Sequence, residues 1–168
     1  MVEYSEKFNK AFEFLIKNEG AYVFDKNDQG GKTKYGISQK AYPTLNIKAL
    51  TLADAKKIYY CDFWLKGKIE QIPDKNVAIK FFDFIVNFGH RAATIVLQRA
   101  LRSAGINVQE DGLIGSQTLS GVIFSEPHIL LAALKSEAAG YYRLIAAKNP
   151  SQQKFLNGWL NRAYKNVN

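Results

Sequence analysis

The sequence has 168 residues and a formal net charge of +8, with 47% apolar and 23% charged residues. These values are typical of a folded soluble protein with one domain, or with two small lobes that share a core. The positive charge favours a polyanionic partner, with solubility alone as the alternative, but the basic residues form no run of three, which argues against a nucleic-acid tail.

Further exclusions follow from single residue types and from the hydropathy pattern. Cys61 is the only cysteine, so we expect no internal disulfide, and with two distant histidines it forms no metal-ligand set; we expect no metal and no cofactor. The start MVEYSEKFNK has no apolar core region, so we expect no ordinary signal peptide. No apolar run approaches the roughly 20 residues that span a bilayer, so we expect no membrane span.

The chain begins with a helical pattern that changes abruptly into a polar ribbon. A helical stripe is formed by apolar residues with the required spacing: Phe8, Ala11, Phe12, Leu15 and Ile16. Gly20 stands where a helix often ends. In residues 21–37, the sequence predicts a small β-hairpin, with a strand at 22–25, a turn at 26–31 and a return strand at 33–37.

The rest of the chain predicts helices. Thr51 can cap the second one, with Asp54 three residues later. Apolar periodicity and punctuating Gly or Pro residues then predict a buried helix at 77–88 that ends at Gly89, and further helices at 93–104, from about 116, at 126–147 and near 155–163. The predicted fold class is mainly α with one small β element. We place the lobe boundary between about 103 and 112, which gives segments 1–103 and 104–168.

Glu19 is the first candidate catalytic residue. It follows Leu15 by four positions and Ile16 by three, which places it on the apolar face in the last helical turn. Desolvation and the negative end of the helix dipole both raise the pKa of a carboxyl group. A carboxylic acid that keeps its proton near neutral pH can act as a general acid, as glycoside hydrolysis requires. The alternative is a solvated helix end without function.

Three ribbon residues could complete such a site. Asp25 or Asp28 could orient water or stabilise an oxocarbenium-like centre, and Thr33 could hold a water molecule. The alternative is a structural role, since Asp and Thr form turns through bonds from their side chains to the backbone.

Several residues outside the ribbon are weaker candidates. Tyr35 and Trp64 could stack on sugar rings. Asn87 could contribute to the substrate floor, although Asp83 and Asn87 share a face of an apolar helix and we expect them mainly to form a structural network, as we expect for Gln98. Cys61 lies among aromatic residues on a helical stripe, so we expect it to pack rather than to act with a histidine as a thiol nucleophile.

Four motifs in order resemble a known family. They are E-G-x-Y followed by D-x-x-D-x-G-G-x-T-x-Y-G-I, then LTLADAKKIYYCDFW, then FDFIVNFGHRAATIVLQRAL, and finally DGLIGSQTL with the F-x-x-G-W-x-x-R pattern near the end. Together they resemble glycoside hydrolase family 108, the lysozyme-like N-acetylmuramidases often found as phage endolysins, with the peptidoglycan-binding region paired with it. Ala21 stands where the family usually has Gly, and Gln29 where it usually has Pro, but neither change removes a chemical group.

The resemblance implies a lysozyme-like helical fold with a C-terminal helical lobe, and it implies that Glu19 is the catalytic acid, with Asp25, Asp28, Thr33 and Tyr35 around the cleft. The expected activity is cleavage of the β-1,4 bond between N-acetylmuramic acid and N-acetylglucosamine. A lytic transglycosylase and a non-catalytic wall-binding or secretion-associated protein are the alternatives. We expect peptidoglycan strands as the partner, no nucleic acid, and a monomer. We also expect synthesis in the bacterial cytoplasm and action at the cell wall after holin-type release.

Overall fold

The computed structural model describes residues 3–19 and 33–167, and helices dominate this part of the chain. Its α-helices are α1 Glu6–Glu19, α2 Leu52–Tyr59, α3 Lys75–Phe88, α4 His90–Ser103, α5 Ser116–Phe124, α6 Pro127–Lys148 and α7 Leu156–Tyr164. Shorter helical turns are η1 Ile47–Ala49, η2 Tyr60–Leu65, η3 Ile69–Gln71 and η4 Pro150–Phe155, of which η2 is a π-helical continuation of α2. The prediction of a mainly α fold is confirmed.

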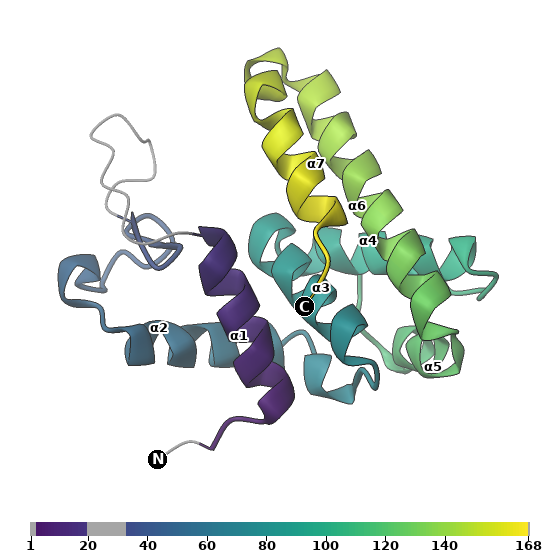
Figure 1. Ribbon diagram of the computed structural model, residues 1–168, viewed down its shortest axis with the longest axis horizontal. Coiled ribbons are helices and arrows are strands. Elements are labelled where there is room, and N and C mark those ends of the chain that lie inside the picture. The colour runs from purple at the N-terminus through teal and green to yellow at the C-terminus, as the bar shows by residue number, and fades with distance from the viewer. Residues whose placement is uncertain (1–2, 20–32, 168) are drawn as a thin grey trace.

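Helix α3 is the centre of the arrangement. Helices α1, α4 and α6 all pack against it, and α6 also packs against α4 and α7. Figure 1 shows α1 and α2 on one side of the molecule, and α6 and α7 rising together on the other. None of the helices within the described ranges is both long and apolar enough to cross a membrane.

One hydrophobic core extends from the first helix to the last. It includes Phe8 and Leu15 of α1, Phe82 of α3, Leu97 of α4 and Ala163 of α7, all without exposed surface. The sequence of α3 is apolar on almost every side, and from Val77 to Ile85 the whole helix is buried, as predicted. The N-terminal and C-terminal helices therefore stabilise each other through shared burial, since apolar area removed from water is the main favourable term in folding.

The predicted helix boundaries are confirmed where the capping chemistry is strong. Thr51 accepts a hydrogen bond from the backbone N–H of Asp54, whose carboxylate accepts the N–H of Thr51 in return, so α2 begins with a complete capping box. Gly89 ends α3 at a φ of +79°, a conformation that glycine adopts without strain, and α4 begins at the next residue.

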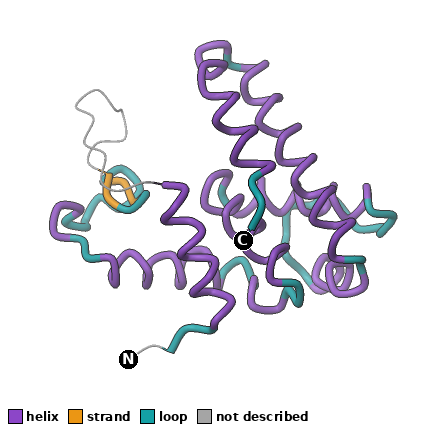
Figure 2. The backbone as a smooth tube through the Cα atoms, viewed as in Figure 1, coloured by secondary structure: helices purple, strands orange, loops and turns teal. Residues whose placement is uncertain are grey.

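The small β-hairpin is present, but its turn lies elsewhere than the sequence suggested. Strand β1 Thr33–Lys34 pairs in antiparallel fashion with β2 Ile37–Ser38, and Tyr35 and Gly36 form the turn between them. The segment 33–37, predicted as one return strand, therefore folds back on itself (Figure 2). Both turn residues have positive φ, which is the requirement of a two-residue hairpin whose twist matches its strands. The predicted first strand and turn lie outside the described residues.

Candidate active site

The site is built around the end of α1. Phe8, Phe12 and Leu15 bury the inner face of this helix, which fixes its direction against the core. Glu19 is its last residue. The side chain of Glu19, together with Asp25 and Asp28, lies outside the described residues, so their predicted roles stay predictions.

The hairpin is attached to α1 through a side chain of α2. The ring of Tyr59 lies 6.0 Å from that of Phe12 in α1, and its hydroxyl donates a 2.9 Å hydrogen bond to the backbone carbonyl of Tyr35. Ile37 of β2 is buried in the core, whereas Thr33 and the Tyr35 ring are half-buried. The fold thus holds Thr33 and Tyr35 in a short element that is anchored to α1 through Tyr59, as a cleft wall would require.

Tyr35 adopts an unusual backbone conformation. Its φ of +53° is uncommon for a residue with a side chain, and Asn or Gly is the usual occupant of this turn position. The ring is accompanied by the ammonium group of Lys34, 5.5 Å from the ring centroid. Positive φ at a residue with a side chain is the kind of backbone strain that functional residues often carry, so Tyr35 remains a candidate.

The loop after the hairpin is fixed by two side chains that sequence reasoning missed. The amide nitrogen of Gln39 donates to three backbone carbonyls, those of Tyr42, Pro43 and Leu45. The hydroxyl of Tyr42 donates to Asp62, and burial together with this carboxylate raises the pKa of Tyr42. No periodicity accompanies such loop contacts, so the sequence carried no signal for them.

Trp64 is not available to a sugar. It has no exposed surface, its indole N–H donates to the carboxylate of Glu70 at 2.9 Å, and its ring packs edge-on against Phe8 and Phe82. The prediction that Trp64 stacks on substrate is therefore wrong: an aromatic residue at helical spacing served the core instead.

The structure also corrects the expectation for Cys61, whose side chain is exposed rather than packed. A ring nitrogen of His90 lies 2.7 Å from the backbone carbonyl oxygen of Asp62, and the imidazole stacks on Phe63. His90 is thus held by the backbone and an aromatic ring and is not arranged as the base of a thiol nucleophile. In the described part of the chain, no three His, Cys, Asp or Glu side chains gather as a metal site would require.

Asn87 is exposed near the end of α3, and its amide nitrogen donates to the backbone carbonyl of Asp83, one turn earlier. Asp83 itself is completely buried and receives hydrogen bonds from the guanidinium group of Arg162 in α7, at 2.8 Å for the shortest. The structural network expected for Asp83 exists, but its main partner is Arg162 and not Asn87. The sequence signal for this partner was Arg162 itself, the arginine of the F-x-x-G-W-x-x-R pattern.

A buried lysine completes this junction. Lys80 has no exposed surface, donates to the backbone carbonyl of Arg162 at 2.7 Å, and lies 3.9 Å from the carboxylate of Asp83. Burial lowers the pKa of Lys80 from 10.5 to about 8, opposed by the nearby Asp83 carboxylate. Two elements far apart in sequence, α3 and α7, are thereby joined through an ionic contact inside the protein.

The DGLIG motif is structural in this protein. The side-chain amide of Gln98, in α4, donates to Asp111 and Thr118 and accepts the backbone N–H of Gly112. Gly112 has a φ of +74°, and a Cβ placed there would lie 2.9 Å from the side chain of Arg91. The structural network expected for Gln98 is confirmed, and it connects α4 to the loop that leads into α5 and to Thr118 of α5.

Two adjoining hollows open where the end of α1 meets α7 and the segment after it. Lys17, Asn18 and Lys165 line both. The first also includes Lys10, Glu13, Phe14 and Asn166, and the second Gly158, Trp159, Asn161 and Arg162. Because Asn18 directly precedes Glu19, these hollows lie at the end of the helix that carries the candidate acid.

Comparisons with known proteins identify two family regions along the chain and a solved structure with a similar fold. Residues 12–89 match the family model of glycosyl hydrolase 108, and residues 92–164 match that of a predicted peptidoglycan domain. The solved structure of SagA from Brucella abortus is similar over 93% of this chain and 88% of that chain, with 27% sequence identity and a TM-score of 0.75. No curated protein matches.

The fold and the matches define a glycosyl hydrolase-type enzyme with a mainly α, lysozyme-like fold. The chain thus has one region that matches glycosyl hydrolase 108 and one that matches a predicted peptidoglycan domain, in the order that its motifs implied, and the second match supports peptidoglycan as its partner. The two matched segments adjoin near residue 90, at the junction of α3 and α4. The lobe boundary between about 103 and 112 stays a prediction.

Proposed function

We propose that the protein is an N-acetylmuramidase, which hydrolyses the β-1,4 bond between N-acetylmuramic acid and N-acetylglucosamine, with Glu19 as the general acid. The observation that carries this proposal is the position of Glu19 as the last residue of α1, within the segment that matches glycosyl hydrolase 108. At that position the helix dipole presents its negative end, which favours the protonated carboxyl group that a leaving oxygen needs.

The second part of the mechanism concerns the positive charge that develops on the sugar. Either Asp25 or Asp28 stabilises this charge or orients water, and Thr33 at the start of β1 holds the water by a hydrogen bond. The anchoring of the hairpin through Tyr59 supports a fixed position for Thr33 and Tyr35. Asn87, exposed at the end of α3, contributes to the substrate floor.

The C-terminal helices support this reaction in two ways. Their match to a predicted peptidoglycan domain favours contact with the wall, and their packing against α3 buttresses the catalytic region. The net charge of +8 favours approach to an anionic polymer, so we expect the rate of wall lysis to fall with added salt. We also propose that the protein acts at the cell wall after release from the cytoplasm, as a monomer.

The decisive experiment digests purified peptidoglycan with the wild type, with Glu19→Gln, and with Glu6→Gln as a control. Glu6 lies on the same helix with an 86% exposed side chain, so its replacement removes a carboxylate without touching the core. We expect mass spectrometry to show reducing muramic ends from the wild type and from Glu6→Gln, and none from Glu19→Gln.

Other products would change the assignment. Ends with a 1,6-anhydro ring would identify a lytic transglycosylase, which acts on the same bond and also works with one glutamate. Intact glycan in every digest, together with tight binding of the wall, would identify a non-catalytic wall-binding protein and refute the proposed role of Glu19.

A further inference from the structure

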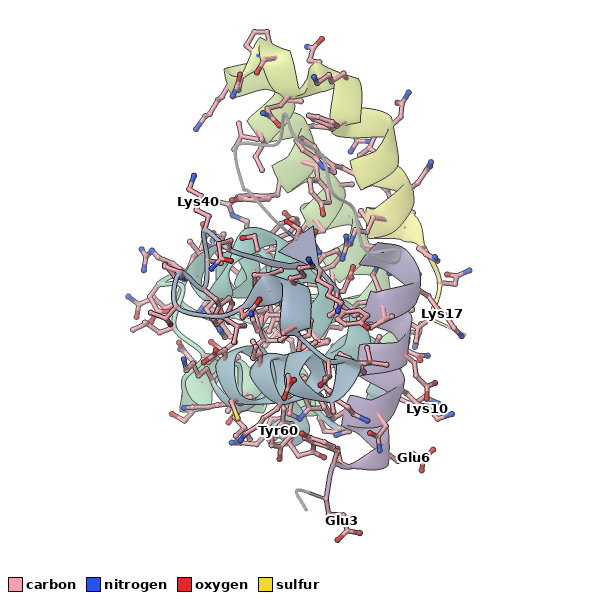
Figure 3. The ribbon with its side chains drawn as sticks, turned by 90° about the vertical axis from the view of Figure 1, so that its left-hand side faces the viewer. Glu3, Glu6, Lys10, Lys17, Lys40 and Tyr60 are labelled. Atoms are coloured by element: carbon pink, nitrogen blue, oxygen red, sulfur yellow. The ribbon has the colours of Figure 1, made fainter. Side chains whose placement is uncertain are left out.

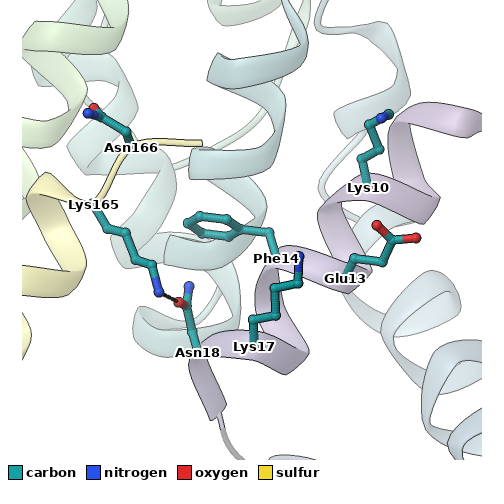
Figure 4. Close-up of a pocket in the computed structure, with 7 residues that line it drawn as sticks. All are labelled: Lys10, Glu13, Phe14, Lys17, Asn18, Lys165 and Asn166. Atoms are coloured by element: carbon teal, nitrogen blue, oxygen red, sulfur yellow. Dashed lines mark hydrogen bonds between the residues drawn. The ribbon is translucent and has the colours of Figure 1, made fainter. Parts of the chain in front are cut away.

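A second face of α1, beside the buried one, also carries residues at regular helical spacing. Lys10, Glu13, Phe14 and Lys17 recur at the spacing that places residues on one side of a helix, and Lys10 and Lys17 project from that side (Figure 3). These residues line a hollow of about 150 Å³, closed on its other side by the segment after α7 (Figure 4). Such a volume holds several water molecules or a small charged group.

Hydrogen-bond donors dominate the inner end of this hollow. The ammonium group of Lys165 donates to the side-chain oxygen of Asn18 at 2.6 Å (Figure 4). Because an ammonium group can only donate, this contact fixes the orientation of the amide and leaves the Asn18 nitrogen as a further donor. That nitrogen is buried and has no hydrogen-bond partner within the described residues. Buried donors without acceptors are rare, and they often mark the place of a ligand or water.

The charges around the hollow are unbalanced. Its lining carries three lysines, Lys10, Lys17 and Lys165, against the single carboxylate of Glu13. The adjoining hollow adds the guanidinium group of Arg162, which is already paired with the buried Asp83. Lys10 is also paired, with the Glu6 carboxylate at 3.9 Å. The positive charge that remains is that of Lys17 and Lys165, both exposed to solvent, against the single carboxylate of Glu13. An anion is the complementary ligand.

The position identifies which anion is within reach. Asn18 immediately precedes Glu19, so the hollow lies beside the end of the helix that carries the proposed acid. On peptidoglycan, the muramic acid at the scissile bond bears a lactyl-linked peptide stem, and that stem carries free carboxylates. We propose that Lys17 and Lys165 form a subsite that binds a carboxylate of this peptide stem. The assignment rests on the proposed muramidase function, because the stem comes near α1 only when the glycan is bound there.

The test compares two substrates with one double variant. Glycan strands with intact stems are compared with the same strands after an amidase has removed the stems, and kcat/KM is measured from the release of reducing ends. The variant is Lys17→Gln/Lys165→Gln. The control is Lys75→Gln/Lys148→Gln, which removes two exposed charges that line neither hollow.

We expect the double variant to lose about tenfold in kcat/KM on strands with stems, the size expected for two partly exposed charge-assisted contacts. On stripped strands it should change by less than about twofold, and the control should affect both substrates alike through general attraction. An equal loss on both substrates, or no loss on either, would overturn the subsite.

A binding measurement separates failure of the subsite from failure of the proposed reaction. Free stem tripeptide is titrated into the wild type and the double variant and followed by NMR, with a peptide whose carboxyl groups are amidated as the negative probe. We expect saturable binding of the free acid to the wild type only. This result would support the subsite even if no glycan bond were cleaved, whereas equal shifts for both peptides or both proteins would refute it. Thermal unfolding of the variant confirms that it is folded.

Discussion

Two carboxylates on apolar helices, Asp83 in α3 and the proposed acid Glu19 in α1, differ in their position within the helix. Asp83 lies inside α3, has no exposed surface, and is held by Arg162 and Lys80. Glu19 is the last residue of α1. Similar apolar spacing surrounds both in the sequence. The comparison teaches that apolar neighbours alone do not single out a candidate acid, because a buried structural carboxylate has the same neighbours. The proposal for Glu19 depends on the further signal that its helix ends there.

Removing the buried carboxylate should have the largest effect on stability. Asp83→Ala removes the buried carboxylate that Arg162 and Lys80 both contact, and we expect a loss of about 3–5 kcal/mol in the free energy of unfolding. Urea unfolding followed by circular dichroism measures it. Replacing both members of the pair, as in Asp83→Leu/Arg162→Met, should recover part of the loss, because the Asp83–Arg162 pair is then replaced by apolar side chains while Lys80 still lacks the carboxylate. If the double variant is as unstable as Asp83→Ala, the pair is not the reason for the loss.

The buried lysine predicts a dependence of stability on pH. Its folded pKa of about 8 lies below the ordinary value of 10.5, so between these values the unfolded chain holds a proton that the folded protein has released. Stability from Lys80 therefore rises with pH in this window, by up to about 1.4 kcal/mol per pH unit, and is constant below it. We expect the free energy of unfolding of the wild type to rise relative to that of Lys80→Met between about pH 8 and about pH 10. A constant difference would show that Lys80 keeps an ordinary pKa.

Gln98 offers a milder comparison, since its own side chain is buried but uncharged. Gln98→Met keeps the shape of the side chain but leaves the N–H of Gly112 without its acceptor and removes a donor from Asp111. We expect a loss of about 2 kcal/mol, typical of a buried polar group left unpaired. Gln39→Met is the matched control, because it also removes an amide, and it acts on the loop after the hairpin. A loss below that of the control would argue against the bridging role of Gln98.

Much of this fold could be predicted from local chemistry. The Thr51 capping box, the buried helix α3 and its end at Gly89 all depend on residues close together in sequence. The pairing of Asp83 with Arg162 could not be predicted in the same way, because it joins residues 79 positions apart and no periodicity records a tertiary contact. Trp64 failed for a related reason: stacking on a sugar and packing in a core require the same aromatic side chain, and only the tertiary structure distinguishes them.

The candidate site, like the fold, could be predicted only in part from the sequence. The helix end at Glu19 and the hairpin near Thr33 follow from the pattern, whereas the turn at Tyr35 does not, because a tyrosine is a poor sequence signal for positive φ. The hollow beside Asn18 also left no sequence signal, since Lys165 reaches it from the other end of the chain.

The hairpin turn at Tyr35 and Gly36 supplies the smallest expected effect on stability, and it contrasts most sharply with the buried Asp83. Tyr35→Asn places the preferred Asn-Gly pair in a turn whose two residues both have positive φ, so we expect a gain of about 0.5–1 kcal/mol in stability. If the tyrosine is kept because its ring contacts a sugar, the same variant should bind glycan less tightly and show a higher KM. Tyr59→Phe is the complementary variant, because it removes the bond to the Tyr35 carbonyl and leaves the ring in place. A Tyr35→Asn protein that is more stable and equally active would show that the strain serves no substrate contact.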